Sequence, residues 1–125
     1  MTNLNIEETK YTPKINLDFE KGIVSIAGKS YPENTFEFYE PVMKWLEEYF
    51  DGNAQETTTI NFEIIYFNSS SSKLFFDLFD LIEENNEKNT IIINWIYDEE
   101  NESALEAGED FQEDFETLTI NLISK

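Results

Sequence analysis

The fold is decided by the stretch from Ile60 to Ile82, which reads INFEIIYFNSSSSKLFFDLFDLI. An apolar strand runs into the polar turn Asn68–Ser72 and then directly into an apolar helix. The first N–H groups of a helix have no partner inside it, and the helix dipole places partial positive charge there. A phosphoryl group on a turn serine would add about −1.5 to −2 charge at a position that stabilises anions. The turn therefore predicts a phosphorylation switch on a small binding domain.

The same serines have an ordinary structural use. Ser and Asn are common helix N-caps, and Ser71 or Ser72 is expected to cap the helix whether or not the turn is modified. Serine runs also occur in flexible linkers. A linker is disfavoured here because apolar residues adjoin the serines on both sides.

Length and composition indicate one domain spanning residues 1–125, with residues 1–10 loosely held. An apolar share of 40% with eleven Phe is enough for a packed core. No run of about 18 apolar residues is present, and the N-terminus has no basic start followed by an apolar segment. We therefore expect no membrane association and a cytoplasmic location.

The net charge of −19 restricts the functions that the chain can have. All eight basic residues are Lys, so the surface repels nucleic acids and anionic membranes. Without His or Cys there is no ordinary zinc site and no Ser-His or Cys-His catalysis. We expect no cofactor and a partner with a basic patch, although the charge could also serve solubility alone.

Hydrophobic periodicity predicts strands alternating with helices. The expected strands are Pro13–Phe19, Ile23–Gly28, Thr57–Phe67, Thr90–Tyr97 and Thr117–Ile123, and the expected helices start near Asn34, Ser72 and Ser103. The first two strands should form a hairpin, whereas strands separated by helices should pair in parallel. The predicted fold class is a single-domain α/β fold with a mixed five-stranded sheet, in the order β-β-α-β-α-β-α-β, and helices mainly on one face.

The start of the first helix and the burial of the second are less clearly determined by the sequence. In the first, Phe36, Tyr39, Val42, Met43, Leu46 and Phe50 are expected to form the buried stripe. Pro41 would cost about 3 kcal/mol inside a helix, so this helix is expected to be kinked or to start near Tyr39. In the second, Phe76 and Phe79 widen the apolar arc, so that helix is either well buried or exposes an aromatic patch.

An enzymatic reading rests on carboxylate density alone. The acidic loop Asp98–Glu102 could hold a divalent cation. It lacks the glycine and the closing glutamate of a calcium-binding loop, so a solvated acidic loop is favoured. We predict no catalytic residues and no metal site.

The strand, the Asn-Ser-Ser turn and the following helix resemble the STAS fold of anti-sigma-factor antagonists. In that fold a Ser or Thr after the first turn residue is phosphorylated by a partner kinase, and here that residue is Ser69. The turn departs from the common pattern, with Asn68 in place of Asp and Ser71 in place of Gly.

A closer resemblance, over almost the whole chain, is to the SiaC family of bacterial regulatory phosphoproteins. The segments that carry it are Ser30–Asn34, Tyr66–Ser71, Asp77–Leu81, Trp95, Tyr97-Asp98, Asn101-Glu102 and Phe111–Asp114. The resemblance implies a serine/threonine protein kinase and a metal-dependent protein phosphatase as partners. It also implies that the unphosphorylated form binds and activates a diguanylate cyclase, which raises cyclic-di-GMP and promotes biofilm.

The expected site residues follow from this resemblance. Ser69 is the expected phosphorylation site, with Ser70 as the alternative. The expected partner contacts are Tyr31, Glu33, Asn34, Asn68, Ser70 and Ser71. An interaction scaffold without a switch remains an alternative, supported by the acidic charge and the aromatic arc of Phe75, Phe76 and Phe79.

Overall fold

The computed structural model describes all 125 residues. The strands are β1 (Leu4–Ile6), β2 (Lys14–Asp18), β3 (Ile23–Ser30), β4 (Thr57–Phe67), β5 (Thr90–Tyr97) and β6 (Thr119–Ser124). The helices are α1 (Thr35–Phe50), α2 (Ser69–Asn85) and α3 (Glu102–Asp114). The predicted alternation of strands and helices is confirmed, and the bounds of β4 and β5 are those expected.

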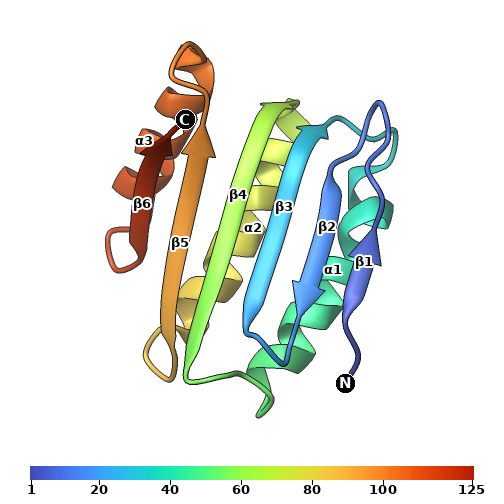
Figure 1. Ribbon diagram of the computed structural model, residues 1–125, viewed down its shortest axis with the longest axis vertical. Coiled ribbons are helices and arrows are strands. Elements are labelled where there is room, and N and C mark those ends of the chain that lie inside the picture. The colour runs from blue at the N-terminus through green and yellow to red at the C-terminus, as the bar shows by residue number, and fades with distance from the viewer.

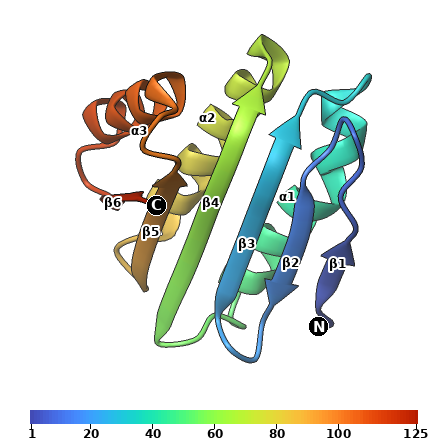
Figure 2. The ribbon, with the colours of Figure 1, turned by 45° about the horizontal axis from the view of Figure 1, so that its top comes forward.

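The six strands form one sheet whose spatial order is the order of the chain, β1 to β6. β1, β2 and β3 pair antiparallel, and β3, β4, β5 and β6 pair in parallel. Each helix connects two parallel neighbours, and each connection advances in the same direction along the sheet. All three helices therefore lie on one face, as expected, and the other face carries none (Figures 1 and 2).

The expectation of five strands was wrong by one, since Leu4–Ile6 adds an edge strand where we expected loose chain. Leu4 pairs with Leu17 and Ile6 with Ile15, and both side chains are half-buried against the core. A three-residue segment with two apolar positions gives too short a pattern to identify a strand from sequence. Its stability comes from pairing with β2.

Helix α1 differs from the expected stripe at its start. The helix begins at Thr35, and Pro41 lies inside it on the solvent side. There the carbonyl that loses its intrahelical partner can bond to water. Phe36 is 69% exposed, whereas Trp45 and Tyr49, which the expected stripe left out, stack in the core with ring centroids 5.0 Å apart.

Helices α2 and α3 share an aromatic layer above the sheet. Phe79 is fully buried, and its ring centroid lies 4.5 Å from that of Phe111 in α3. Phe76 contacts Phe111 and Phe115 but remains 38% exposed, so α3 covers only part of the wide apolar arc of α2. Gly108 permits this packing, because a Cβ there would lie 2.6 Å from Cδ1 of Trp95.

Candidate functional site

Helix α2 begins where β4 ends, and Asn68 makes the junction. The Asn68 side chain accepts a hydrogen bond from the Ser71 N–H at 2.9 Å, and its carbonyl accepts one from the Ser72 N–H at 2.9 Å. The expectation that Ser71 or Ser72 would cap α2 was therefore wrong. Asn68 lies one residue before the helix with an extended backbone, which is the geometry an N-cap requires.

The four serines that follow Asn68 occupy different environments. Ser69 and Ser70 are exposed, Ser72 is half-buried and Ser71 is fully buried. Ser69 is the first residue of α2, and the N–H groups of the first helical residues have no intrahelical acceptor. Only Ser69 and Ser70 thus combine an accessible hydroxyl with a position over unpaired amides.

Ser71 belongs to a buried network of hydroxyl groups that joins three elements. Its Oγ donates to the Ser30 carbonyl at 2.9 Å and lies 2.8 Å from the Ser30 Oγ. The Ser30 Oγ is in turn 2.6 Å from the Tyr39 hydroxyl of α1. Burial raises the pKa of Tyr39 well above its ordinary value, which keeps this phenol protonated. The network holds the start of α2 against the end of β3 and the first turns of α1.

Helix α1 starts beside α2 and is capped in the same way. Asn34 Oδ1 accepts from the Glu37 N–H at 3.1 Å. Between the two helix starts lies a groove of about 290 Å³, lined by Glu33, Asn34, Thr35, Phe36, Ser70, Lys73 and Leu74. The groove brings the expected partner residues Glu33, Asn34 and Ser70 together. It also contains the exposed Phe36, which sequence reasoning had placed in the core.

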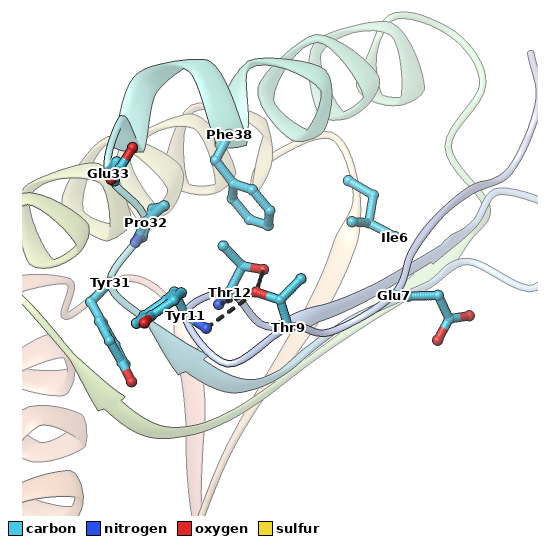
Figure 3. Close-up of a pocket in the computed structure, with 9 residues that line it drawn as sticks. All are labelled: Ile6, Glu7, Thr9, Tyr11, Thr12, Tyr31, Pro32, Glu33 and Phe38. Carbon is cyan, nitrogen blue, oxygen red and sulfur yellow. Dashed lines mark hydrogen bonds between the residues drawn. The ribbon is translucent and has the colours of Figure 1, made fainter.

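A second cavity, of about 830 Å³, lies between the loop after β1 and the loop that leads into α1 (Figure 3). Tyr31 and Glu33 line it together with Tyr11, Pro32 and Phe38. The Tyr31 ring contacts Tyr11 and Tyr66 edge to face, with centroids 5.3 and 5.5 Å apart. Glu33 lines both this cavity and the groove between the two helix starts. The expected contacts Tyr31, Glu33 and Asn34 therefore form one continuous surface.

A β-bulge in β4 places Tyr66 beside Tyr31. Gly28 pairs with Ile64 and Lys29 pairs with Tyr66, so Ile65 is an extra residue in β4. Ile65 and Tyr66 are both more than half exposed, whereas Phe67 packs on Phe75 and Trp95. Bulges are rare in parallel pairs and often reorient side chains near functional sites. The sequence signals for Tyr66 are the loss of strict alternation after Ile64 and its place in the Tyr66–Ser71 segment of the resemblance.

The structure brings the expected site residues together with one exception. Ser71 is 0% exposed, so a partner cannot touch it in this conformation, and its role is to anchor the turn. Asn68 is half-buried and acts as the cap. Tyr11, Phe36 and Tyr66 were not among the expected contacts and lie next to those that were.

The groups that this surface presents are hydroxyls, amides and aromatic rings. No group of three or more Asp or Glu side chains is placed to share a metal ion. None of the three helices is both long and apolar enough to cross a membrane. The surface offers exposed hydroxyls over helix amides, flanked by aromatic side chains.

Comparison with known proteins identifies the family. Residues 6–125 match the family described as SiaC family regulatory phosphoprotein. An uncharacterized protein of Pseudomonas aeruginosa (strain UCBPP-PA14) is 36% identical over 115 residues, which cover 91% of this chain and 90% of that protein.

Solved structures support the same family assignment. SiaC of Pseudomonas aeruginosa superimposes with a TM-score of 0.90 at 31% identity, covering all of both chains. A similar match, with a TM-score of 0.91 at 32% identity over 98% of this chain and 99% of the other, is to a complex from the same organism. That complex contains the diguanylate cyclase SiaD and its activator SiaC. This chain belongs to the SiaC family of regulatory phosphoproteins.

Proposed function

We propose that this chain is a non-enzymatic switch in a partner-switching pathway. A serine/threonine protein kinase phosphorylates Ser69, and a metal-dependent phosphatase removes the phosphate. The unphosphorylated form binds and activates a diguanylate cyclase and so raises cyclic-di-GMP. The pathway operates in the cytoplasm, where the nucleotide substrates of kinase and cyclase are found.

The observation that carries this proposal is the placement of Ser69. Its hydroxyl is exposed at the first residue of α2, beside the groove that contains Glu33, Asn34 and Ser70. A kinase can reach this hydroxyl without unfolding the turn. The solved complex of SiaD with its activator SiaC, which shares this fold at 32% identity, supports a diguanylate cyclase as the class of output protein.

The switch follows from local electrostatics. A phosphate on Ser69 adds about −1.5 to −2 charge and a shell of bound water. The unpaired N–H groups at the start of α2 stabilise that charge, so the folded domain accepts the modification. A partner that docks over the two helix starts must desolvate the phosphate, and binding therefore weakens.

The site is tested by incubation with the kinase of the same organism, followed by phosphopeptide mapping. The expected result is a single phosphate on the peptide that contains Ser69, abolished in Ser69→Ala and retained in Ser70→Ala. Ser70→Ala is a matched control because it removes the neighbouring exposed hydroxyl from the same turn. Full labelling of Ser69→Ala would show that the site is wrong.

The switch is tested separately from the site by isolating the protein from its own cells. We expect phosphorylated and unphosphorylated forms whose ratio changes between aggregating and dispersed growth. Protein that carries no phosphate in either state would instead favour an interaction scaffold that binds its partner constitutively.

A further inference from the structure

The sheet face opposite the helices is uncovered along its whole width (Figures 1 and 2). Antiparallel sheets often leave one face to water, but parallel sheets are almost always covered on both faces. Here the four strands β3 to β6 are parallel and are covered on one face only. The parallel part of this mixed sheet therefore leaves a face that another molecule can cover.

Charge is distributed unequally between the two faces. The helices carry fourteen of the 27 acidic residues, four on α1, four on α2 and six on α3, against two lysines. On the open face of β2 to β6, alternation with the buried positions leaves Asp18 and Glu63 as the acidic residues. Lys14 and Lys29 share that face, and Lys125 pairs with Glu63. The open face is therefore close to neutral in a chain of net charge −19.

An amide row, made of Asn side chains from five strands and Ser25 from β3, crosses the middle of the open face. The register aligns Asn5, Asn16, Ser25, Asn61, Asn94 and Asn121. Asn121 Nδ2 donates to Asn94 Oδ1 at 3.2 Å, and Asn94 Nδ2 donates to Asn61 Oδ1 at 2.9 Å. This hydrogen-bonded chain leaves a donor group at Asn61 and an acceptor oxygen at Asn121.

Apolar side chains flank the amide row on both sides. Ile92 lies on one side of it, and Ile96 and Ile123, which pair with each other, lie on the other. Ile23, Ile65 and Ile123 are 36%, 57% and 40% exposed. The open face thus combines exposed apolar side chains with hydrogen-bonding groups, and protein interfaces contain both.

We propose that the open face is a dimerisation surface for a second copy of this chain, with the two sheets packed face to face about a two-fold axis near Asn94. This axis runs parallel to the strands, so it places β4 of one copy over β6 of the other. The donor end of each amide row then faces the acceptor end of its partner's row, so the pattern is self-complementary, as an isologous interface requires.

The charge distribution favours a second copy of this chain, rather than a basic protein, as the molecule that covers the open face. A basic protein is attracted to the acidic helices rather than to the neutral face. Two copies of a chain with net charge −19 repel each other least when they meet across the neutral face. The four parallel strands alone give a flat footprint of roughly 500 Å², from strands about 4.8 Å apart and about eight residues long. This is of the same order as the ~800 Å² per partner of a standard interface.

Sedimentation velocity over a range of protein concentrations tests the proposal at low and high salt. We expect a monomer–dimer equilibrium that shifts toward the dimer as salt rises, because salt screens the repulsion between acidic copies while the neutral interface is unaffected. Association with a basic partner would show the opposite salt dependence. A monomer at concentrations of about 100 μM in both salts, with Kd thus above the range of functional dimers, would overturn the proposal.

Variants locate the interface. Asn94→Asp places two like charges at the axis and should weaken dimerisation at least tenfold. Asn53→Asp makes the same change of charge in the loop after α1 and should have no effect. Equal effects of the two variants would overturn the location. Circular dichroism melts establish that both variants are folded.

Crosslinking gives an independent readout, because the chain contains no cysteine. Asn94→Cys should give a covalent dimer with a bismaleimide that spans about 10 Å, the spacing of packed sheets. Glu47→Cys, on the outer side of α1, should remain monomeric under the same conditions. Crosslinking of the second variant alone would place the contact on the helices and contradict the proposal.

Discussion

Ser69 and Ser71 lie two residues apart on one turn of α2, yet they have opposite surroundings. Ser69 is exposed, and Ser71 is fully buried with its Oγ bonded to the Ser30 carbonyl. A helix turns by about 100° per residue, so residues two apart point in nearly opposite directions. One hydroxyl is thus available for modification because the other holds the turn in place.

The largest effect on stability is expected for a charge at the buried position, Ser71. Ser71→Asp would place a carboxylate beside the Ser30 carbonyl with no cation nearby, and should lower the free energy of unfolding by about 3 kcal/mol or more. Ser70→Asp, its exposed neighbour, should change it by less than about 0.5 kcal/mol. Urea unfolding measures both. Similar losses for the two variants would show that burial does not separate these serines.

A smaller effect is expected at the far end of the buried network. Tyr39→Phe removes the hydroxyl that lies 2.6 Å from the Ser30 Oγ, and should cost about 1 kcal/mol in urea unfolding at neutral pH. Ser30 and Ser71 still bond to each other in this variant, so the turn should remain intact.

The same variant carries a pH signature. Burial raises the pKa of Tyr39 in the folded state, so its stabilising contribution is complete below the unfolded pKa near 10. That contribution is lost as pH rises above 10 toward the folded pKa. Tyr39→Phe should therefore flatten the alkaline decline of stability, and an unchanged decline would show that the phenol is not buried in solution.

The cap residue should have an effect of similar or lower size. Asn68→Ala removes the acceptor of the Ser71 N–H and should cost about 1 kcal/mol. Asn101→Ala, which removes the equivalent cap of α3 from the Ala104 N–H together with a hydrogen bond to the Ile65 carbonyl, is the control and should cost at least as much. If only Asn68→Ala also increases proteolysis within residues 68–72, the cap is what orders the modifiable turn.

Much of the fold could be predicted because its long elements have clear periodicity. β4 alternates from Ile60 to Ile64, and β5 is the most apolar strand, so both strands were found with the right bounds. β1 was missed because three residues carry too little pattern. Phe36 was misplaced because helical spacing gives a residue's direction but not where the neighbouring helix stops covering it.

The site was predictable to the level of the turn but not of the single hydroxyl. The sequence placed four serines between a strand and a helix, and the resemblance selected Ser69. Neither the sequence nor the resemblance shows that Asn68 is the cap of α2. With Asn68 as the cap, the helix starts at Ser69 rather than at Ser72, and Ser71 is buried. The β-bulge at Ile65, which brings Tyr66 beside Tyr31, depends on the register with β3, which the loss of alternation after Ile64 does not reveal.

Ser69 itself should have the smallest effect on stability and the largest on binding. Replacing it with Ala or Asp should change the free energy of unfolding by less than about 0.5 kcal/mol, because the side chain is exposed. The most direct measurement is calorimetric titration of the organism's diguanylate cyclase with unmodified and Ser69-phosphorylated protein. Our account predicts binding by the unmodified form and at least tenfold weaker binding by the phosphorylated form. Equal affinities would contradict it.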